Sequence, residues 1–261
     1  MPDAASFVAP GPFVIVALAL VGFVAGLVDA IAGGGGVLTL PALLAAGLPA
    51  HLALGTNKGC STFGTATATA TFALRGRLAL RRTLLGFAAG ALGAALGARL
   101  QLAISPKALR PIVLVLLIGV AVVLAVQRPK QPGDEVVTRV PHSVHLATAI
   151  ALTFGLYDGF FGPGTGTFLI VTQVMLMQAT MSEATADAKP INLGSNVASL
   201  VTFAMKGTVV WAIALPMAVG NILGGAIGAR IAMKGGDRVV RLSVIGVSLM
   251  LVAKLTYDLT R

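Results

Sequence analysis

Two lysines stand in stretches of the chain that are otherwise almost free of charge. Lys58 follows Gly55-Thr56-Asn57, and Lys189 follows Asp187-Ala188. Burying an ionisable side chain in such an apolar stretch is costly, so we expect each lysine to have a function. Hydroxyl and amide side chains follow both lysines at helical spacing, and with an ammonium group they suit the binding of an oxyanion. The predicted set is Asn57, Lys58, Ser61, Lys189, Asn192 and Asn196.

Two glycine-rich stretches add a second anion-binding feature. One is Gly33 to Gly36, and the other is Gly162-Pro163-Gly164-Thr165-Gly166. A broken helix leaves backbone N–H groups unpaired, which an apolar medium tolerates only beside a cavity or a ligand. Glycine permits close approach, and a helix that begins after the break directs free donors at an anion. We therefore predict that the site includes Gly33, Gly34, Gly35, Gly36, Gly164, Thr165 and Gly166.

Asp29 and Asp158 lie just before the two glycine-rich stretches. A carboxylate there can cap free backbone donors as a structural group, or it can titrate during a transport cycle as a coupling group. The lysines have a structural alternative too. Lys58 would pair with Asp29 as a lock between helices, and Lys189 would pair with Asp158 or Asp187. The sequence does not choose between these roles.

The elements that carry these residues have the composition of membrane segments. Of the 261 residues, 56% are hydrophobic and 11% are charged, and the mean hydropathy is +0.92. Soluble domains carry roughly 25% charged residues. The net charge of +10 does not indicate a nucleic-acid binder, because the basic residues cluster in short connections with almost no aromatic residues between them. We expect an all-α integral membrane protein that lies in a lipid bilayer and binds no nucleic acid.

The sequence predicts no cofactor, no metal ion and no enzymatic reaction. No Gly-Lys-Ser/Thr follows Gly33 to Gly36, so this stretch is not a nucleotide-binding phosphate loop. His51, His142 and His145 lie at the ends of predicted segments, without the spacing of metal ligands. An enzyme within the membrane would need a nucleophile with a histidine, or a metal set. A scaffold that transports nothing would have no use for paired polar breaks.

The chain contains an internal duplication. Gly26-Leu27-Val28-Asp29 recurs as Gly155-Leu156-Tyr157-Asp158, and ordered matches follow, among them Lys58 with Lys189. We assign one transmembrane domain with three parts: a first membrane repeat at 1–127, a linker at 128–141, and a second membrane repeat at 142–261.

Each repeat contains five apolar segments. The second segment of each is too short to cross a bilayer comfortably, so the first two form either full helices or a broken, re-entrant pair. Either choice leaves an odd number of crossings, which gives inverted-topology repeats with roughly 8–10 membrane segments in all. The segments are 12–32, 37–47, 52–74, 83–103 and 109–127 in the first repeat, and 143–162, 167–180, 189–205, 209–231 and 239–257 in the second.

Basic residues support the inversion and set its orientation. The connection 75–82 carries four arginines and its repeat equivalent 206–211 one lysine, whereas 230–241 is richer in basic residues than its equivalent 104–110. Connections rich in lysine and arginine stay in the cytoplasm. We therefore place 75–82, 230–241 and the linker 128–141 in the cytoplasm, and both termini outside.

Small residues recur at every fourth position in two predicted segments. Such runs allow close helix contact, so we assign them to packing, either within the protomer or between the two protomers of a homodimer. The runs are Gly86-Gly90, Gly93-Gly97 and Gly220-Gly224-Gly228.

The chain resembles the TauE/SafE family of exporters of sulfite and other sulfur-containing anions, and the resemblance covers nearly its whole length. It rests on Gly26 to Gly36, Gly55-Thr56-Asn57-Lys58, Asp158 to Gly166, Lys189, and the Gly-x-Arg ends at Arg99 and Arg230. It implies a secondary transporter in a bacterial-type inner (plasma) membrane that exports sulfite or a related organosulfonate. The anion would be held at the repeat interface during alternating access. A negative cell interior favours anion exit by about 2.3 kcal/mol per charge per 100 mV.

The alternative is a transporter of a different solute. That solute would be another organic anion, or a cation held by Asp29 and Asp158. Transport would then run outward or, in an importer, inward. A flux measurement with a panel of anions and cations separates these alternatives.

Overall fold

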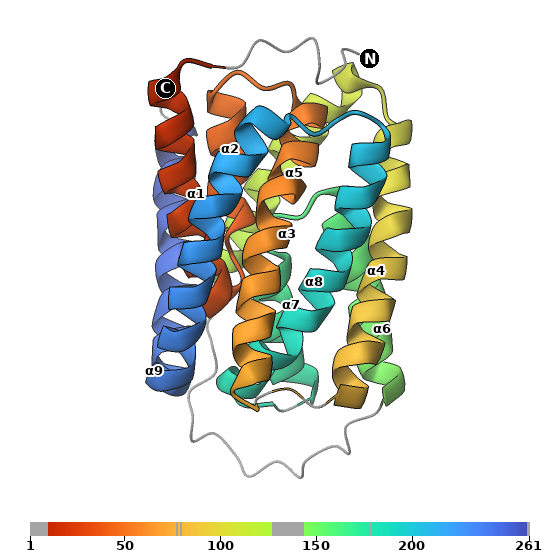
Figure 1. The fold of residues 1–261 in the computed structure, drawn as a ribbon, viewed down its shortest axis with the longest axis vertical. Coiled ribbons are helices and arrows are strands. Elements are labelled where there is room, and N and C mark those ends of the chain that lie inside the picture. Colours follow the sequence, from red (N-terminus) through yellow and green to blue (C-terminus); the bar gives the residue numbers. More distant parts are fainter. Residues whose placement is uncertain (1–9, 77, 79, 127–143, 178, 260–261) are drawn as a thin grey trace.

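The computed structural model describes residues 10–76, 78, 80–126, 144–177 and 179–259. Within these ranges the protein is all-helical, with nine helices and no strand, as expected for an all-α chain (Figure 1). The helices are α1 (Pro12–Ala32), α2 (Gly36–Ala45), α3 (Ala50–Leu74), α4 (Leu80–Ala103), α5 (Pro106–Val126), α6 (Val144–Phe160), α7 (Thr165–Met177), α8 (Met181–Met205) and α9 (Trp211–Leu259).

The two glycine-rich stretches interrupt the helices where the sequence predicts. Helix α1 ends at Gly33, whose φ of 76° is left-handed and whose N–H bonds the carbonyl of Asp29. Between α6 and α7, Gly162 and Gly164 also have positive φ, at 99° and 82°. These are backbone conformations that side chains with a Cβ avoid. Glycine therefore ends one helix of each pair and lets the next begin.

The helices that follow the breaks are short. Helix α2 has 10 residues and α7 has 13, which correspond to about 15 Å and 20 Å of length against a hydrocarbon core of about 30 Å. Neither helix is long enough to cross a bilayer alone. The expectation that these two segments are short is confirmed.

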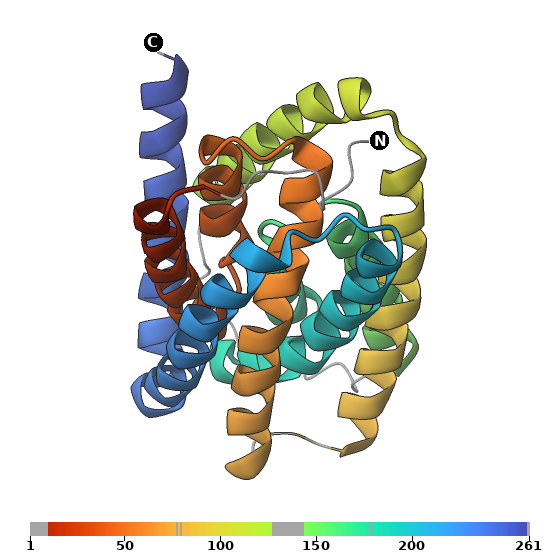
Figure 2. The same ribbon diagram turned by 45° about the horizontal axis from the view of Figure 1, so that its top comes forward.

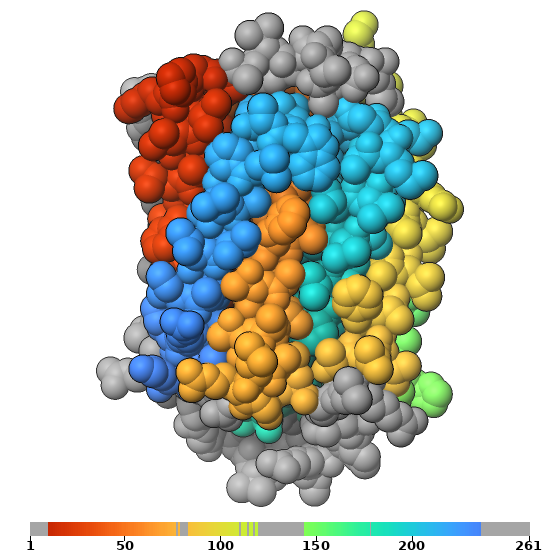
Figure 3. All heavy atoms as spheres, in the orientation of Figure 1, coloured from red at the N-terminus to blue at the C-terminus, as the bar shows by residue number. Residues whose placement is uncertain are grey.

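Helices α3 and α8 run side by side through the middle of the molecule (Figure 1). On the outer side of α3 lies α9, which also packs against α1. On the outer side of α8 lies α4, which also packs against α6. Figure 3 shows α9, α3, α8 and α4 covering one face as adjacent diagonal bands, with no deep opening between them. The core of the molecule is therefore closed on this face.

Glycine faces bring two of these helix pairs into backbone contact. On α4, Gly93 and Gly97 lie against the backbone of α6, and on α9, Gly220 and Gly224 lie against the backbone of α1. A Cβ at any of these positions would overlap the facing main chain. Small residues four apart let helices approach this closely in the absence of a hydrophobic driving force between them. The glycine runs of α4 and α9 thus pack within the protomer, which is one of the two expected alternatives.

Large apolar side chains lie on the outer faces of the same helices. Leu92, Leu96 and Leu100 of α4 are exposed, as are Val219 and Leu223 of α9. Small residues therefore face the inside and leucines face the outside. This arrangement is the opposite of that in a soluble helix bundle and suits a lipid environment. Among the described residues, three helical stretches are long and apolar enough to cross a membrane: Pro12–Ala32, Thr83–Ala103 and Trp211–Gly235.

Helix α9 covers two of the predicted segments. The sequence predicts two segments, 209–231 and 239–257, with a connection between them, but helical backbone runs from Trp211 to Leu259. Figure 2 shows a sharp change of direction within α9, after which it rises to the C-terminal end. The intervening residues include glycine but no proline. Glycine costs a helix only about 1 kcal/mol, so helical hydrogen bonding continues there. The two predicted segments are therefore joined by helical backbone, within one helix that changes direction (Figure 2).

Two predictions lie outside the described residues. They concern the linker 128–141 and the two chain ends, 1–9 and 260–261.

Candidate functional site

The two buried lysines form ion pairs that cross between the halves of the chain. Lys58 of α3 lies with its Nζ 2.7 Å from Oδ1 of Asp158 on α6. Lys189 of α8 lies with its Nζ 3.8 Å from Oδ2 of Asp29 on α1, and donates a hydrogen bond to the Asp29 backbone carbonyl. Both lysines are buried, with 2% and 1% of their surface exposed. Each lysine thus meets the carboxylate of the other half.

This pairing corrects the structural alternative drawn from the sequence. That alternative matched Lys58 with Asp29, and Lys189 with Asp158 or Asp187, but the observed partners are exchanged. The reason is the packing: α6 brings Asp158 to α3 across the centre, and α1 brings Asp29 to α8. Sequence spacing says where charges lie on each helix and not which helix ends meet.

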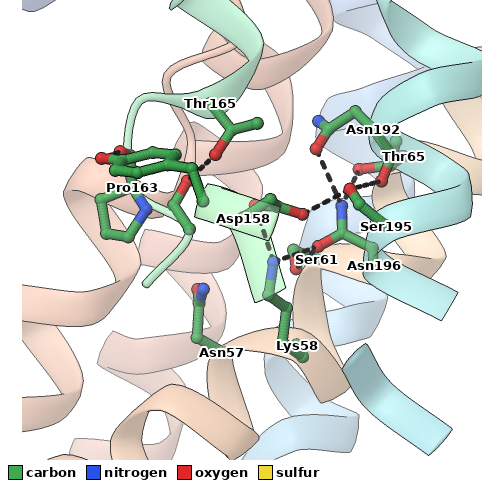
Figure 4. Close-up of polar contacts among 12 residues, drawn as sticks. Asn57, Lys58, Ser61, Thr65, Asp158, Pro163, Thr165, Asn192, Ser195 and Asn196 are labelled. Carbon is green, nitrogen blue, oxygen red and sulfur yellow. Dashed lines mark hydrogen bonds and ion pairs between the residues drawn. The ribbon is translucent and has the colours of Figure 1, made fainter. Parts of the chain in front are cut away.

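A network of amide and hydroxyl groups surrounds the Lys58 ammonium. Asn196 of α8 accepts hydrogen bonds from Lys58 at 2.9 Å and from Ser61 at 3.2 Å. Its amide nitrogen donates to the hydroxyl of Thr65 at 3.4 Å and to the side-chain oxygen of Asn192 at 3.3 Å. Figure 4 shows the ammonium between the Asp158 carboxylate and Asn196. Asn196 therefore links the polar faces of α3 and α8.

Asp158 has a second partner besides the lysine. Its Oδ2 accepts a hydrogen bond of 2.5 Å from the hydroxyl of Ser195, one residue before Asn196 on α8 (Figure 4). The two carboxylate oxygens are thus bound separately, one by an ammonium and one by a hydroxyl.

The Lys189 side of the site is less tightly closed. The Asp29 side chain is 14% exposed, against 3% for the Asp158 side chain. Lys189 is held mainly by a backbone carbonyl, and the nearest carboxylate oxygen is beyond normal hydrogen-bond distance. The two crossed pairs are therefore related in kind but differ in geometry.

The two glycine breaks touch one another. The N–H of Thr167 donates to the carbonyl of Gly33 at 3.1 Å, and the Thr167 hydroxyl donates to the carbonyl of Ala32 at 2.7 Å. A Cβ added at Gly33 or at Gly166 would overlap the main chain of the other. Glycine at both positions is what lets the ends of α1 and the start of α7 meet.

A second contact joins the other ends of these breaks. Gly36, at the start of α2, lies beside Pro163, where an added Cβ would be 3.2 Å from the proline Cα. At Gly162, an added Cβ would lie 3.2 Å from the Lys58 Nζ and 3.3 Å from Oδ1 of Asp158. The second break therefore borders the Lys58–Asp158 pair directly.

Some predicted site residues have local roles in the observed conformation. Asn57 is buried and accepts a hydrogen bond from Thr39 of α2, away from the ammonium. The Thr165 hydroxyl bonds the carbonyl of Gly162 at 2.6 Å. Gly34 and Gly35 accept bonds at the start of α2, and Gly164 accepts one from the N–H of Phe168 in α7. The residues brought together around the lysines are Ser61, Asn192, Asn196, Asp29 and Asp158.

Sequence reasoning missed three threonines that contribute to the site. Thr65 follows Ser61 by four residues, so helical spacing alone could have placed it on the same face of α3. Thr39 and Thr167 lie in the short helices after the breaks, where no spacing connects them to their partners Asn57 and Ala32. Only the packing of distant helices reveals those two.

The site combines two buried ammonium groups, two carboxylates and several neutral donors. Such a set can hold a small anion if one carboxylate gives up its lysine, because ammonium, hydroxyl and amide groups all donate to oxyanions. Among the described residues, no group of three or more histidine, cysteine, aspartate or glutamate side chains could hold a metal ion.

Apolar helices of membrane length and ion pairs buried between them define the class: this is a helical membrane protein with an internal polar site, as membrane transporters have. Comparison with known families places it more closely. The model of the family described as sulfite exporter TauE/SafE matches residues 18–255, and the chain belongs to this family. The resemblance predicted from the sequence is confirmed.

Curated relatives are similar over almost their entire length. The chain is 39% identical to the probable membrane transporter protein ORF9 of a Sinorhizobium species, over 91% of this chain and 90% of the relative. It is 36% identical to the probable membrane transporter protein YfcA of Escherichia coli K12, over 95% and 91%. A probable membrane transporter protein of Haemophilus influenzae is 37% identical, over 91% and 92%. No solved structure matches the chain. The chain is a membrane transporter.

Proposed function

We propose that this protein exports sulfite, or a related small organosulfonate anion, and holds the anion at the interface between its two halves. The observation that carries the proposal is that two buried lysines, one from each half, each lie beside a carboxylate of the other half, and that the two glycine breaks touch each other. Binding sites of secondary transporters lie where interrupted helices meet near the bilayer midplane. The choice of sulfite as the substrate rests on the description of the family as sulfite exporter TauE/SafE.

The chemistry of the site favours an anion over a cation. Asp158 and Asp29, the carboxylates that would hold a cation, each already lie beside an ammonium group. The remaining side chains around Lys58 include hydroxyl and amide donors, which complete the shell of an oxyanion as readily as that of a carboxylate. An anion can therefore take the place of a carboxylate without leaving a lysine unpaired.

We further propose that the two halves are inverted repeats that work by alternating access. Support comes from matched packing in the halves: α1 packs against α9 as α6 packs against α4, and α3 packs against α9 as α8 packs against α4. We place the protein in a bacterial-type inner (plasma) membrane. The orientation follows the basic connections, with 75–82 in the cytoplasm and both termini outside. No nucleotide is needed, because the membrane potential drives anion exit.

Flux in reconstituted liposomes tests the proposed function. Vesicles that are loaded with labelled sulfite and contain the purified protein are expected to lose label faster than equally loaded vesicles without protein. A negative interior potential should accelerate the loss. Lys58→Ala and Lys189→Ala variants should lose most of this flux, since each lacks one ammonium group of the site. Parental rates in both variants would show that the anion is held elsewhere.

A panel of solutes separates sulfite from the alternatives. Sulfate, sulfoacetate, acetate and a monovalent cation are offered in the same vesicles, with Lys107→Ala as the control for loss of a lysine on the exposed surface. Flux of the cation alone, abolished by Asp29→Asn, would favour a cation carrier. Flux of a different anion with the same dependence on Lys58 and Lys189 would keep the site and replace the substrate.

A further inference from the structure

We infer that the Asp158 carboxylate is an internal substitute for the transported anion. The carboxylate pairs with Lys58 while the site is empty and releases the lysine when the anion binds. This inference rests on the proposed function, because it assigns a role within an anion-binding site. It differs from a purely structural lock and from a titrating group. Its content is that the carboxylate and the anion compete for one ammonium group.

Charge balance gives the reason for such a substitute. Lys58 and Asp158 are both buried, and their side chains are each 3% exposed. A buried ammonium group without a partner is strongly unfavourable in an apolar medium. A transporter that has released its anion must still change conformation to return. With Asp158 on the lysine, the empty site is neutral and this return is not blocked by an unpaired charge.

Asp158 keeps one of its two partners when the anion binds Lys58. Oδ1 meets the ammonium at 2.7 Å, whereas Oδ2 accepts a separate hydrogen bond from Ser195. Loss of the first contact does not remove the second. Gly162 contributes space, because it has no side chain beside the Lys58 Nζ and Asp158 Oδ1. We expect an incoming oxygen atom to reach the ammonium on this side, where the glycine break borders the pair.

In the other pair the carboxylate lies farther from its lysine. Oδ2 of Asp29 lies 3.8 Å from Lys189, and the ammonium bonds the Asp29 backbone carbonyl. The Asp29 side chain is more exposed than that of Asp158. The same protein therefore holds one lysine with its carboxylate in contact and one with its carboxylate apart. We assign the competition to Asp158 because only its contact is close.

Two flux measurements on one variant test the inference. Asp158→Asn keeps the shape of the side chain and removes its charge, so the empty site would retain an unpaired lysine. Net efflux of labelled sulfite into sulfite-free buffer, which needs the empty protein to return, is expected to fall about 100-fold relative to exchange against external unlabelled sulfite. Exchange does not need the empty protein, so it should persist. An unchanged ratio of net efflux to exchange, at whatever absolute rates, overturns the inference.

Two further variants serve as controls for the loss of charge at Asp158. Asp158→Glu retains a carboxylate and should keep the ratio near the parental value. Asp187→Asn makes the same chemical change on α8, outside the two lysine–aspartate pairs, and should leave both rates as they are. A fall in the ratio for Asp187→Asn as large as that for Asp158→Asn would also contradict a specific role of Asp158.

Binding provides a second readout that does not depend on transport. Sulfite should raise the melting temperature of purified Asp158→Asn at concentrations about tenfold lower than for the parental protein, because the internal competitor is gone. Equal or weaker binding by this variant overturns the inference. If the parental protein itself neither binds nor moves any anion of the panel, the proposed function fails. If it does and Asp158→Asn behaves like it, only the present inference fails.

Discussion

Replacing Gly33 by alanine tests whether the two glycine breaks meet. Gly33 has φ of 76°, and an added Cβ would overlap the main chain of Gly166 and Thr167. The left-handed backbone costs alanine about 1–2 kcal/mol, and forcing a methyl group into a packed contact costs about 1–3 kcal/mol more. Together these predict a loss of about 2–5 kcal/mol in the free energy of unfolding for Gly33→Ala.

Gly76→Ala is the matched control. Gly76 has φ of 64°, close to that of Gly33, but nothing lies within 4 Å of an added Cβ. It should lose only the backbone cost of about 1–2 kcal/mol. Both variants are unfolded by titration with SDS in mixed micelles, and the fluorescence of Trp211, the single tryptophan, reports the transition. Losses that agree within about 0.5 kcal/mol would refute the contact between the breaks.

Three further predictions concern the ion pair, the glycine face and the start of α8. Lys58→Ala leaves the Asp158 carboxylate buried without its ammonium partner and should lower the free energy of unfolding by about 3–5 kcal/mol. The double variant Lys58→Ala/Asp158→Ala should lower it by less, and equal losses would argue against a direct pair. Gly97→Leu drives a side chain into the backbone of α6 and should lower the melting temperature by about 5–10 °C, while Gly119→Leu on α5, which has nothing within 4 Å, should change it little; similar shifts would contradict the close packing of α4 and α6. Thr180→Ala removes the capping box at the start of α8 and should lose about 1 kcal/mol in the SDS titration, and an unchanged midpoint would show that the cap does not hold this helix.

The sequence predicts the helices and their breaks well because the signals are local. Glycine at Gly33 and Gly162 is needed for left-handed backbone, and the segment 12–32 coincides with α1 because its apolar run ends at that glycine. The lysines could be singled out because a charge in an apolar stretch stands out by itself. Both proved to be buried.

The partners of those residues could not be predicted in the same way. Asp158 meets Lys58 because α6 and α3, from different halves, are brought together by helix packing over the whole molecule. Thr167 bonds Ala32 for the same reason. Long-range contacts of this kind leave no mark in the spacing of either segment. Helix α9 continues past Gly235 because glycine weakens a helix without ending it.

An experimental structure with bound selenite would test the central claim most directly. Selenite resembles sulfite in shape and charge, and selenium can be located by its anomalous scattering. We predict a selenium position within about 4 Å of the Lys58 or Lys189 Nζ, beside the breaks at Gly33 and Gly162, with the Asp158 carboxylate displaced from Lys58 wherever that lysine is occupied. Selenium elsewhere, for example in the small cavity between α4, α6, α7 and α8 that Gln173 lines, with both lysine–aspartate pairs intact, would contradict the account.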